Sequence, residues 1–289
     1  MSPARTPHGR VFLNGRILPR GQARIACDDA GFLLGVGAFE TLKVEDGIPL
    51  FLRDHLQRLR SGLRRIGINA FPWDTGDAVA QVIRANRLGT AALRITVSDG
   101  APADEPTLLV ASRDVMPRPP MVRLAVYPRR KSAHDPLAGL KTTSRLPYEL
   151  ARRWAAAQDC FDALLANEEG DLAEGSLCNL FCVRSGRIVT PPLSRGLLPG
   201  VTRARILAIC RRVRLPVVES PVRLDDLRRA EEVFLSNSTQ GVLGVDRVRG
   251  LRRTYPGAEG LLAQRIAAAY AEHVARHKQA IADSQPNRA

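Results

Sequence analysis

Residues 136–148 read PLAGLKTTSRLPY, and their single lysine, Lys141, stands among small and apolar neighbours. The whole chain of 289 residues contains only three other lysines, Lys43, Lys131 and Lys278. Burial of a lysine lowers its pKa, because desolvation disfavours the ammonium, and a neutral amine can attack a carbonyl carbon. A surface lysine in front of a helix is the plainer interpretation, so segments farther along the chain must decide between the two.

A second candidate for chemistry lies in residues 162–183, DALLANEEGDLAEGSLCNLFCV. The pattern predicts a strand, an acidic turn and a second strand, with Glu174 just before small residues and an apolar run. A carboxylate at this place can enter a pocket, or it can be a solvated turn residue. Spacing alone leaves both interpretations open.

Two turns with small polar residues are candidates for anion binding. Residues 190–203, TPPLSRGLLPGVTR, lead into a predicted helix, and the N–H groups at a helix start can bind a phosphate. Thr202 adds a hydroxyl there and is a candidate helix cap. Residues 232–241, EVFLSNSTQG, end an apolar strand in small polar residues that include Ser238 and Thr239. Helix capping and simple turn formation are the competing interpretations.

Arg58 lies on a predicted helix over residues 53–66, where leucine and isoleucine recur at helical spacing. A guanidinium can clamp a phosphate with two hydrogen bonds. The chain is rich in arginine and has a formal net charge of +14, so a solvated helix arginine is the plainer interpretation. Because the arginines are spread along the whole chain and aromatic residues make up only 5% of it, a nucleic-acid-binding surface is disfavoured.

Composition narrows the class of protein. Hydrophobic residues make up 45% and charged residues 25% of the chain, close to the averages of globular proteins. No apolar run approaches the about 20 residues needed to cross a bilayer, and residues 1–10 lack the apolar centre of a secretory signal. The five cysteines are scattered, without a CxxC pair that could bind zinc. We expect a cytoplasmic protein with no membrane contact and no metal site.

The order of the predicted elements indicates an α+β fold with two domains. Strand pairs and helices alternate within residues 1–117, and three prolines within residues 116–120 predict the boundary. Residues 118–289 are expected to form a larger, strand-rich C-terminal domain that carries Lys141.

Taken in order, these segments resemble the fold-type IV family of pyridoxal phosphate enzymes, which includes branched-chain and D-amino acid aminotransferases and aminodeoxychorismate lyase. The resemblance covers nearly the whole chain and implies the family's two-domain fold, a homodimer, and pyridoxal 5'-phosphate (PLP) as cofactor. The matching stretches are DAGFLLGVGAFET at 29–41, DHLQRL at 54–59, the lysine segment, EGSLCNLF, TPPLSRGLLPGVTR and FLSNSTQGVLGV.

The resemblance also implies a role for each candidate residue. Lys141 would hold PLP as a Schiff base, and Glu174 would pair with the pyridine nitrogen, which keeps the ring an effective electron sink. Leu198 would pack on the cofactor ring. The phosphate would be held by Arg58, Val201 through its backbone, Thr202, Ser238 and Thr239.

Within the family, the lysine segment is most similar to the lyases. The aminotransferases commonly have a tyrosine five residues after the lysine, and this chain has Leu146 there. At the position of Thr41 the lyases are similar to this chain, whereas branched-chain aminotransferases tend to have glycine there. We expect Thr41 to bind a substrate carboxylate or relay a proton. Residues 93–100, LRITVSDG, lack the arginine and histidine pair of the D-amino acid aminotransferases.

The resemblance therefore implies a lyase that converts 4-amino-4-deoxychorismate, a small anionic amine, to 4-aminobenzoate and pyruvate on the way to folate. Two alternatives stay open. One is a class IV aminotransferase that acts on D-amino acids or branched-chain amino acids. The other is a basic protein that has lost the cofactor and binds nucleic acid, which salt-sensitive binding would reveal.

Overall fold

The structure is a computed structural model, and it describes residues 8–69, 71–102 and 105–284. These residues form the α+β structure that the sequence predicts, and they group into two compact units. The lysine unit contains the residues up to Met116, residues 140–145 and those from Arg276 onward. The carboxylate unit contains residues 117–139 and 146–275. Within the described ranges, no helix has the length and apolar character that crossing a membrane requires.

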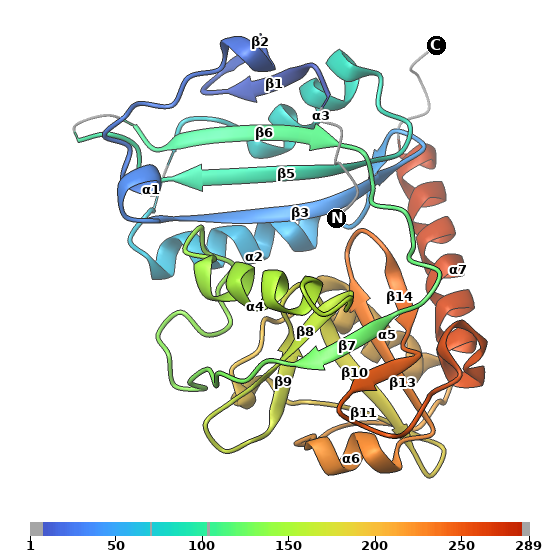
Figure 1. The fold of residues 1–289 in the computed structure, drawn as a ribbon. Coiled ribbons are helices and arrows are strands. Elements are labelled where there is room, and N and C mark those ends of the chain that lie inside the picture. Colours follow the sequence, from blue (N-terminus) through green and yellow to red (C-terminus); the bar gives the residue numbers. More distant parts are fainter. Residues whose placement is uncertain (1–7, 70, 103–104, 285–289) are drawn as a thin grey trace. The chain divides into compact units, whose positions relative to one another are not determined.

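An antiparallel six-stranded sheet forms the centre of the lysine unit. Helices α2 (Leu52–Arg65) and α3 (Thr75–Asn86) share an apolar core with this sheet, and α2 runs along β3 (Figure 1). Side chains along a strand point alternately to opposite faces, so Glu40 faces α2 while Phe39 and Thr41 face the other side. The strand order is β2 (Arg16–Pro19), β1 (Arg10–Leu13), β6 (Thr107–Arg113), β5 (Ala91–Ser98), β3 (Gly37–Glu45) and β4 (Ile48–Pro49).

Residues 140–145 pair with β3. The N–H of Phe39 donates to the carbonyl of Lys141 at 2.9 Å, and an antiparallel bridge joins Ala38 to Thr142. The sequence analysis placed Lys141 in the C-terminal domain, whereas this backbone pairing groups it with the N-terminal strands. The division into domains at residues 117 and 118 stays a prediction.

The carboxylate unit contains two sheets whose apolar residues share one core, including Leu164 from one sheet and Leu235 from the other. The four-stranded sheet has the order β15 (Arg247–Arg249), β7 (Arg123–Val126), β8 (Asp162–Ala166) and β9 (Leu172–Gly175). The five-stranded sheet has the order β12 (Val217–Glu219), β11 (Arg187–Thr190), β10 (Asn179–Arg184), β13 (Glu232–Asn237) and β14 (Gly241–Gly244).

Four α-helices belong wholly or partly to the carboxylate unit among the described residues. The helix predicted after the turn at residues 190–203 is α5 (Val201–Arg212), and α4 (Leu146–Ala156) begins five residues after Lys141. A short helix, α6 (Leu224–Arg229), precedes β13. The C-terminal helix, α7 (Leu261–Asp283), begins in this unit, and its residues from Arg276 onward group with the lysine unit.

Candidate functional site

Lys141 contacts the aromatic ring of Phe39 in the lysine unit. Its Nζ lies 4.8 Å from the centre of this ring, and the guanidinium carbon of Arg94 lies 3.7 Å from the same centre. Phe39 is on β3 and Arg94 is on the neighbouring strand β5. Because the face of an aromatic ring attracts cations, Phe39 brings an amine and a guanidinium together where an anion can meet both.

The amine of Lys141 is a weak base for a lysine. Burial and the positive charge of Arg58 lower its pKa to about 7, although the carboxylate of Glu40 acts in the opposite direction. A large share of the amine is therefore neutral near pH 7, as nucleophilic attack requires. This environment favours the chemical interpretation of Lys141 over that of a solvated surface lysine.

The lowered pKa predicts selective reactivity at Lys141. In the ligand-free protein, reductive methylation should modify Lys141 first, at a rate that rises with pH through about 7, because only the neutral amine reacts. Lys131 and Lys278 are internal controls. Although burial opposes the charge at Lys131, Glu174 and Tyr148 raise its pKa, and hydrogen bonds to Asp46 and Glu45 raise the pKa of Lys278. Peptide mass spectrometry measures the site preference, and equal modification of the three lysines at neutral pH would contradict it.

Arg58 is held in place by a buried carboxylate. Its Nε and Nη2 each donate to Glu40 at 2.7 Å, and Nδ1 of His55 donates to the same carboxylate at 2.7 Å. This tautomer of His55 follows because a carboxylate can only accept. Although burial opposes ionisation, Arg58 and His55 lower the pKa of Glu40 to about 2, and burial lowers the pKa of His55. Arg58 is therefore part of an ordered ion pair and is not a solvated helix arginine.

Thr41 lies beside Arg94 on the sheet. Its Cα is paired with that of Arg94 across β3 and β5, on the side of the sheet that faces away from α2. Phe39, two residues earlier on β3, faces the same side. The predicted catalytic threonine therefore has a guanidinium as its neighbour, a residue that the sequence analysis did not select.

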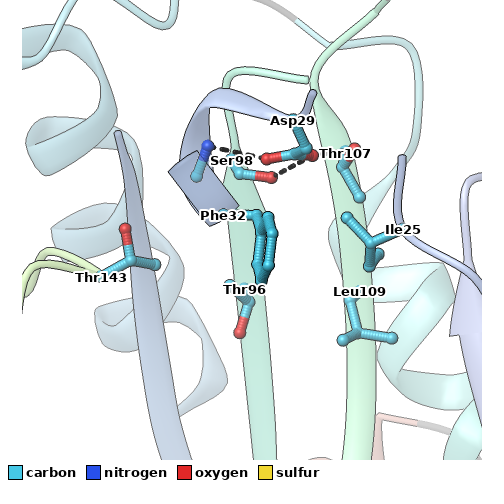
Figure 2. A pocket seen from close by; sticks show the side chains of 9 residues that line it. Ile25, Asp29, Phe32, Thr96, Ser98, Thr107, Leu109 and Thr143 are labelled. Carbon is cyan, nitrogen blue, oxygen red and sulfur yellow. Dashed lines mark hydrogen bonds between the residues drawn. The ribbon is translucent and has the colours of Figure 1, made fainter. Parts of the chain in front are cut away.

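A pocket of about 200 Å³ lies in the same unit (Figure 2). The buried carboxylate of Asp29 accepts from the N–H of Gly31 at 2.7 Å, from Ser98 at 2.9 Å and from Thr107 at 2.8 Å. Because these three donors already satisfy Asp29, the pocket offers hydroxyl groups and apolar walls instead of a free charge. None of the predicted site residues is among its lining residues, which are Ile25, Asp29, Gly31, Phe32, Thr96, Ser98, Thr107, Leu109 and Thr143.

Glu174 is buried within β9, with 4% of its surface exposed, and is not a solvated turn residue. Its Oε1 accepts from Nζ of Lys131 at 2.8 Å and from the hydroxyl of Tyr148 at 3.1 Å. Its Oε2 accepts from the N–H of Leu198 at 3.0 Å. Two predicted residues, Glu174 and Leu198, are therefore in direct contact. The sequence analysis missed Lys131 and Tyr148, although the scarcity of lysine was a signal that could have selected Lys131.

The start of α5 is capped differently from the prediction. The N-cap is Gly200, and a Cβ at this position would overlap with Oδ1 of Asn179. Thr202 therefore does not cap the helix as predicted. Its hydroxyl is buried, and it has no hydrogen-bond partner among the residues that the structure describes. An unpaired buried hydroxyl costs about 1–3 kcal/mol, so an external acceptor next to the N–H groups of the helix start would stabilise this site.

Ser238 and Thr239 lie in the turn after β13, a strand that packs against α5. Oδ1 of Asn237 accepts from the N–H of Thr239 at 3.0 Å and from its hydroxyl at 3.1 Å, which orders the turn. Ser236, on β13, is also buried, and within the described ranges its hydroxyl has no partner. The sequence analysis counted Ser236 among the small polar residues at the end of this strand, but it selected only Ser238 and Thr239 as candidate phosphate ligands.

Comparisons with known proteins place these residues in a family context. A family model described as amino-transferase class IV matches residues 37–248. The aminodeoxychorismate lyase of Bacillus subtilis is 26% identical over 247 residues, which cover 81% of this chain and 84% of that protein. The D-alanine aminotransferase of Bacillus licheniformis is 25% identical over 280 residues, with coverage of 89% and 94%.

A solved structure shows the same likeness. The branched-chain aminotransferase of Thermoproteus uzoniensis, solved with norvaline, aligns with a TM-score of 0.83 at 25% identity and covers 94% of this chain and 95% of its own. The three relatives carry names of three different reactions, while the matched segment contains Lys141, Glu174, Thr202 and Thr239.

Proposed function

The chain belongs to the class IV aminotransferase family and is a PLP-dependent enzyme, and from this premise we propose that it converts 4-amino-4-deoxychorismate to 4-aminobenzoate and pyruvate. The observation that carries this choice is at residue 146, where the family's aminotransferases commonly place a tyrosine that reaches the cofactor. Leu146 offers no hydroxyl, and it is 67% exposed. The similarity to the lyase of B. subtilis supports the same choice.

The residues present fit PLP. A phosphate next to the start of α5 would give the buried hydroxyl of Thr202 the acceptor that it lacks within the described ranges. We propose that Lys141 holds the cofactor covalently, that Glu174 pairs with its pyridine nitrogen and that Leu198 packs on its ring. Bound PLP supplies an electron sink through its protonated ring. The proposed phosphate ligands are Arg58, Val201, Thr202, Ser238 and Thr239.

In the proposed reaction, the substrate amine would replace Lys141 on the cofactor, and the freed lysine would act as the base. Its amine takes the adjacent ring proton of the substrate, which the pKa of about 7 permits near neutral pH. The carbon–oxygen bond to the enolpyruvyl group then breaks, the ring becomes aromatic, and the released group gains a proton to give pyruvate. Thr41 and Arg94 would hold a substrate carboxylate, since a guanidinium binds such a group with two hydrogen bonds. We propose that the active form is a homodimer.

The test uses the purified enzyme and 4-amino-4-deoxychorismate. We expect 4-aminobenzoate and pyruvate in equal amounts, measured by chromatography and by a lactate dehydrogenase assay. The absorbance of the cofactor aldehyde should be the same before and after turnover, because the lyase reaction leaves no amino group on the cofactor.

The second candidate is an aminotransferase acting on D-amino acids or branched-chain amino acids, which the names of two relatives favour. It predicts that an amino acid alone converts the cofactor to its amine form, and that a keto acid then restores the aldehyde. Amino-acid turnover without pyruvate formation from 4-amino-4-deoxychorismate would contradict the lyase proposal.

A further inference from the structure

Three donors reach the carboxylate of Glu174 from within the carboxylate unit. Lys131 and Tyr148 occupy Oε1, and the N–H of Leu198 occupies one side of Oε2. A carboxylate can accept about four hydrogen bonds, two at each oxygen. Oε1 already accepts two and Oε2 accepts one, so Oε2 can accept one more. Leu198 is also the residue proposed to pack on the cofactor ring. The remaining acceptor position of Glu174 therefore lies next to the ring-packing residue, which suits a pyridine N–H.

Lys131 is a full counter-ion of Glu174. Its Nζ lies 2.8 Å from Oε1, with 17% of the lysine side chain and 5% of the glutamate side chain exposed. Nζ also donates to the hydroxyl of Tyr148 at 2.8 Å, and this hydroxyl donates to Oε1, which closes a three-membered network. Although burial opposes the charge, Glu174 and Tyr148 raise the pKa of Lys131, so its ammonium is retained. One buried negative charge is thus already balanced within the protein.

We propose that Lys131 is a positioning residue that shares the charge of Glu174 with the pyridine nitrogen and so limits how strongly the enzyme favours a protonated cofactor ring. The inference rests on the proposed pairing of Glu174 with this nitrogen, and it does not depend on the choice between lyase and aminotransferase. Two cations beside one carboxylate repel each other. Loss of the Lys131 ammonium leaves the buried Glu174 carboxylate without a counter-ion, which is unfavourable. A protonated pyridine ring would then replace the missing positive charge.

The experiment compares two ligands of the full-length enzyme after removal of its PLP. One is PLP, and the other is 1-deaza-PLP, in which a C–H group replaces the pyridine nitrogen. The ratio of their Kd values isolates the nitrogen contact, because the aldehyde and the phosphate are identical. Lys131→Met should raise the preference for PLP by about tenfold or more, the effect of one pKa unit or more at the nitrogen. If the methionine variant does not fold, Lys131→Gln replaces it in the experiment. This variant also lacks the charge, and the same increase in the preference for PLP is expected.

Three further variants make the result specific. Lys131→Arg keeps the positive charge and should return the ratio toward that of the wild type. Lys278→Met removes a lysine that pairs with Glu45 and Asp46, and it should leave the ratio unchanged. Glu174→Gln should abolish the preference for PLP, both alone and together with Lys131→Met.

Each other outcome overturns the inference in a distinguishable way. If Lys131→Met leaves the ratio unchanged, or weakens both ligands equally, while Glu174→Gln abolishes the preference, Lys131 has only a structural role. If the preference survives Glu174→Gln, neither residue acts on the pyridine nitrogen. If the lyase proposal is wrong, no pyruvate forms from 4-amino-4-deoxychorismate, while the ratios of the Kd values still change as expected.

Discussion

Replacing Lys141 with methionine is expected to reduce turnover by at least about 10⁴-fold while stabilising the cofactor-free protein near neutral pH. Turnover falls because the variant loses both the proposed covalent anchor of PLP and the proposed base. Stability rises because burial and the positive charge of Arg58 disfavour the ammonium form of Lys141 in the folded protein. A methionine fills a similar volume and needs no counter-charge.

The gain in stability has a definite pH dependence. The pKa of Lys141 is about 7 in the folded protein, against an ordinary value of 10.5. Between these values the unfolded chain binds a proton that the folded chain lacks, so the stability of the wild type rises with pH across this window. The advantage of the methionine variant is therefore largest below about pH 7 and shrinks toward pH 10.5. One pKa unit corresponds to about 1.36 kcal/mol, so we expect a difference of roughly 2–5 kcal/mol at its largest.

Denaturant unfolding of both cofactor-free proteins over this pH range measures the difference in the free energy of unfolding. Lys278→Met is the matched control. It removes a lysine that pairs with the exposed Asp46 and the partly exposed Glu45, so turnover should be retained and stability should change little. Turnover within about tenfold of the wild type, or a methionine variant that is less stable than the wild type at neutral pH, would refute the role assigned to Lys141.

Replacing Arg58 with methionine is expected to destabilise the protein by about 3–5 kcal/mol, because it leaves the buried Glu40 carboxylate without its counter-ion. The proposed contact of Arg58 with the cofactor phosphate would be lost as well, so affinity for PLP should fall. With Arg58 gone, burial raises the pKa of Glu40 from its value of about 2, and the destabilisation should become smaller as the pH falls.

A double-mutant cycle separates the ion pair from other effects of the substitution. Glu40→Gln removes the charge that Arg58 balances, so Arg58→Met should cost clearly less in that background than in the wild type. Arg60→Met is the control, since Arg60 is exposed on the same helix and its loss should change stability by less than about 0.5 kcal/mol. Equal costs of Arg58→Met in both backgrounds would show that the pair with Glu40 contributes nothing.

Local pattern was sufficient to predict the elements that carry the site. The leucine spacing of residues 53–66 predicted α2, and the apolar run that ends in small polar residues within 232–241 predicted β13. These patterns are set by near neighbours along the chain, since helices and strands repeat every few residues. The family, the fold class and PLP also followed from the order of short motifs, and the match over residues 37–248 confirms them.

The partners of the predicted residues could not be found in the same way. Glu174 meets Lys131, 43 residues before it, and Leu198, 24 residues after it. Such pairs depend on how distant segments cross and in which register they pair. The start of α5 shows the same limit, because the close approach of Asn179, 21 residues earlier in the chain, leaves no room for a Cβ at the N-cap Gly200.

The sequence by itself determined which residue types are present and in what order, and so it determined the family and its cofactor, and it predicted Lys141 as the residue that holds PLP. Only the tertiary structure decided their electrostatic state. Lys141 is a weak base because burial and Arg58 act on it together, and Arg58 is fixed because Glu40, on a strand 18 residues earlier, receives two of its hydrogen bonds. The physical reason is that the pKa of a group depends on the charges and solvent around it in space, which the order of residues along the chain does not specify.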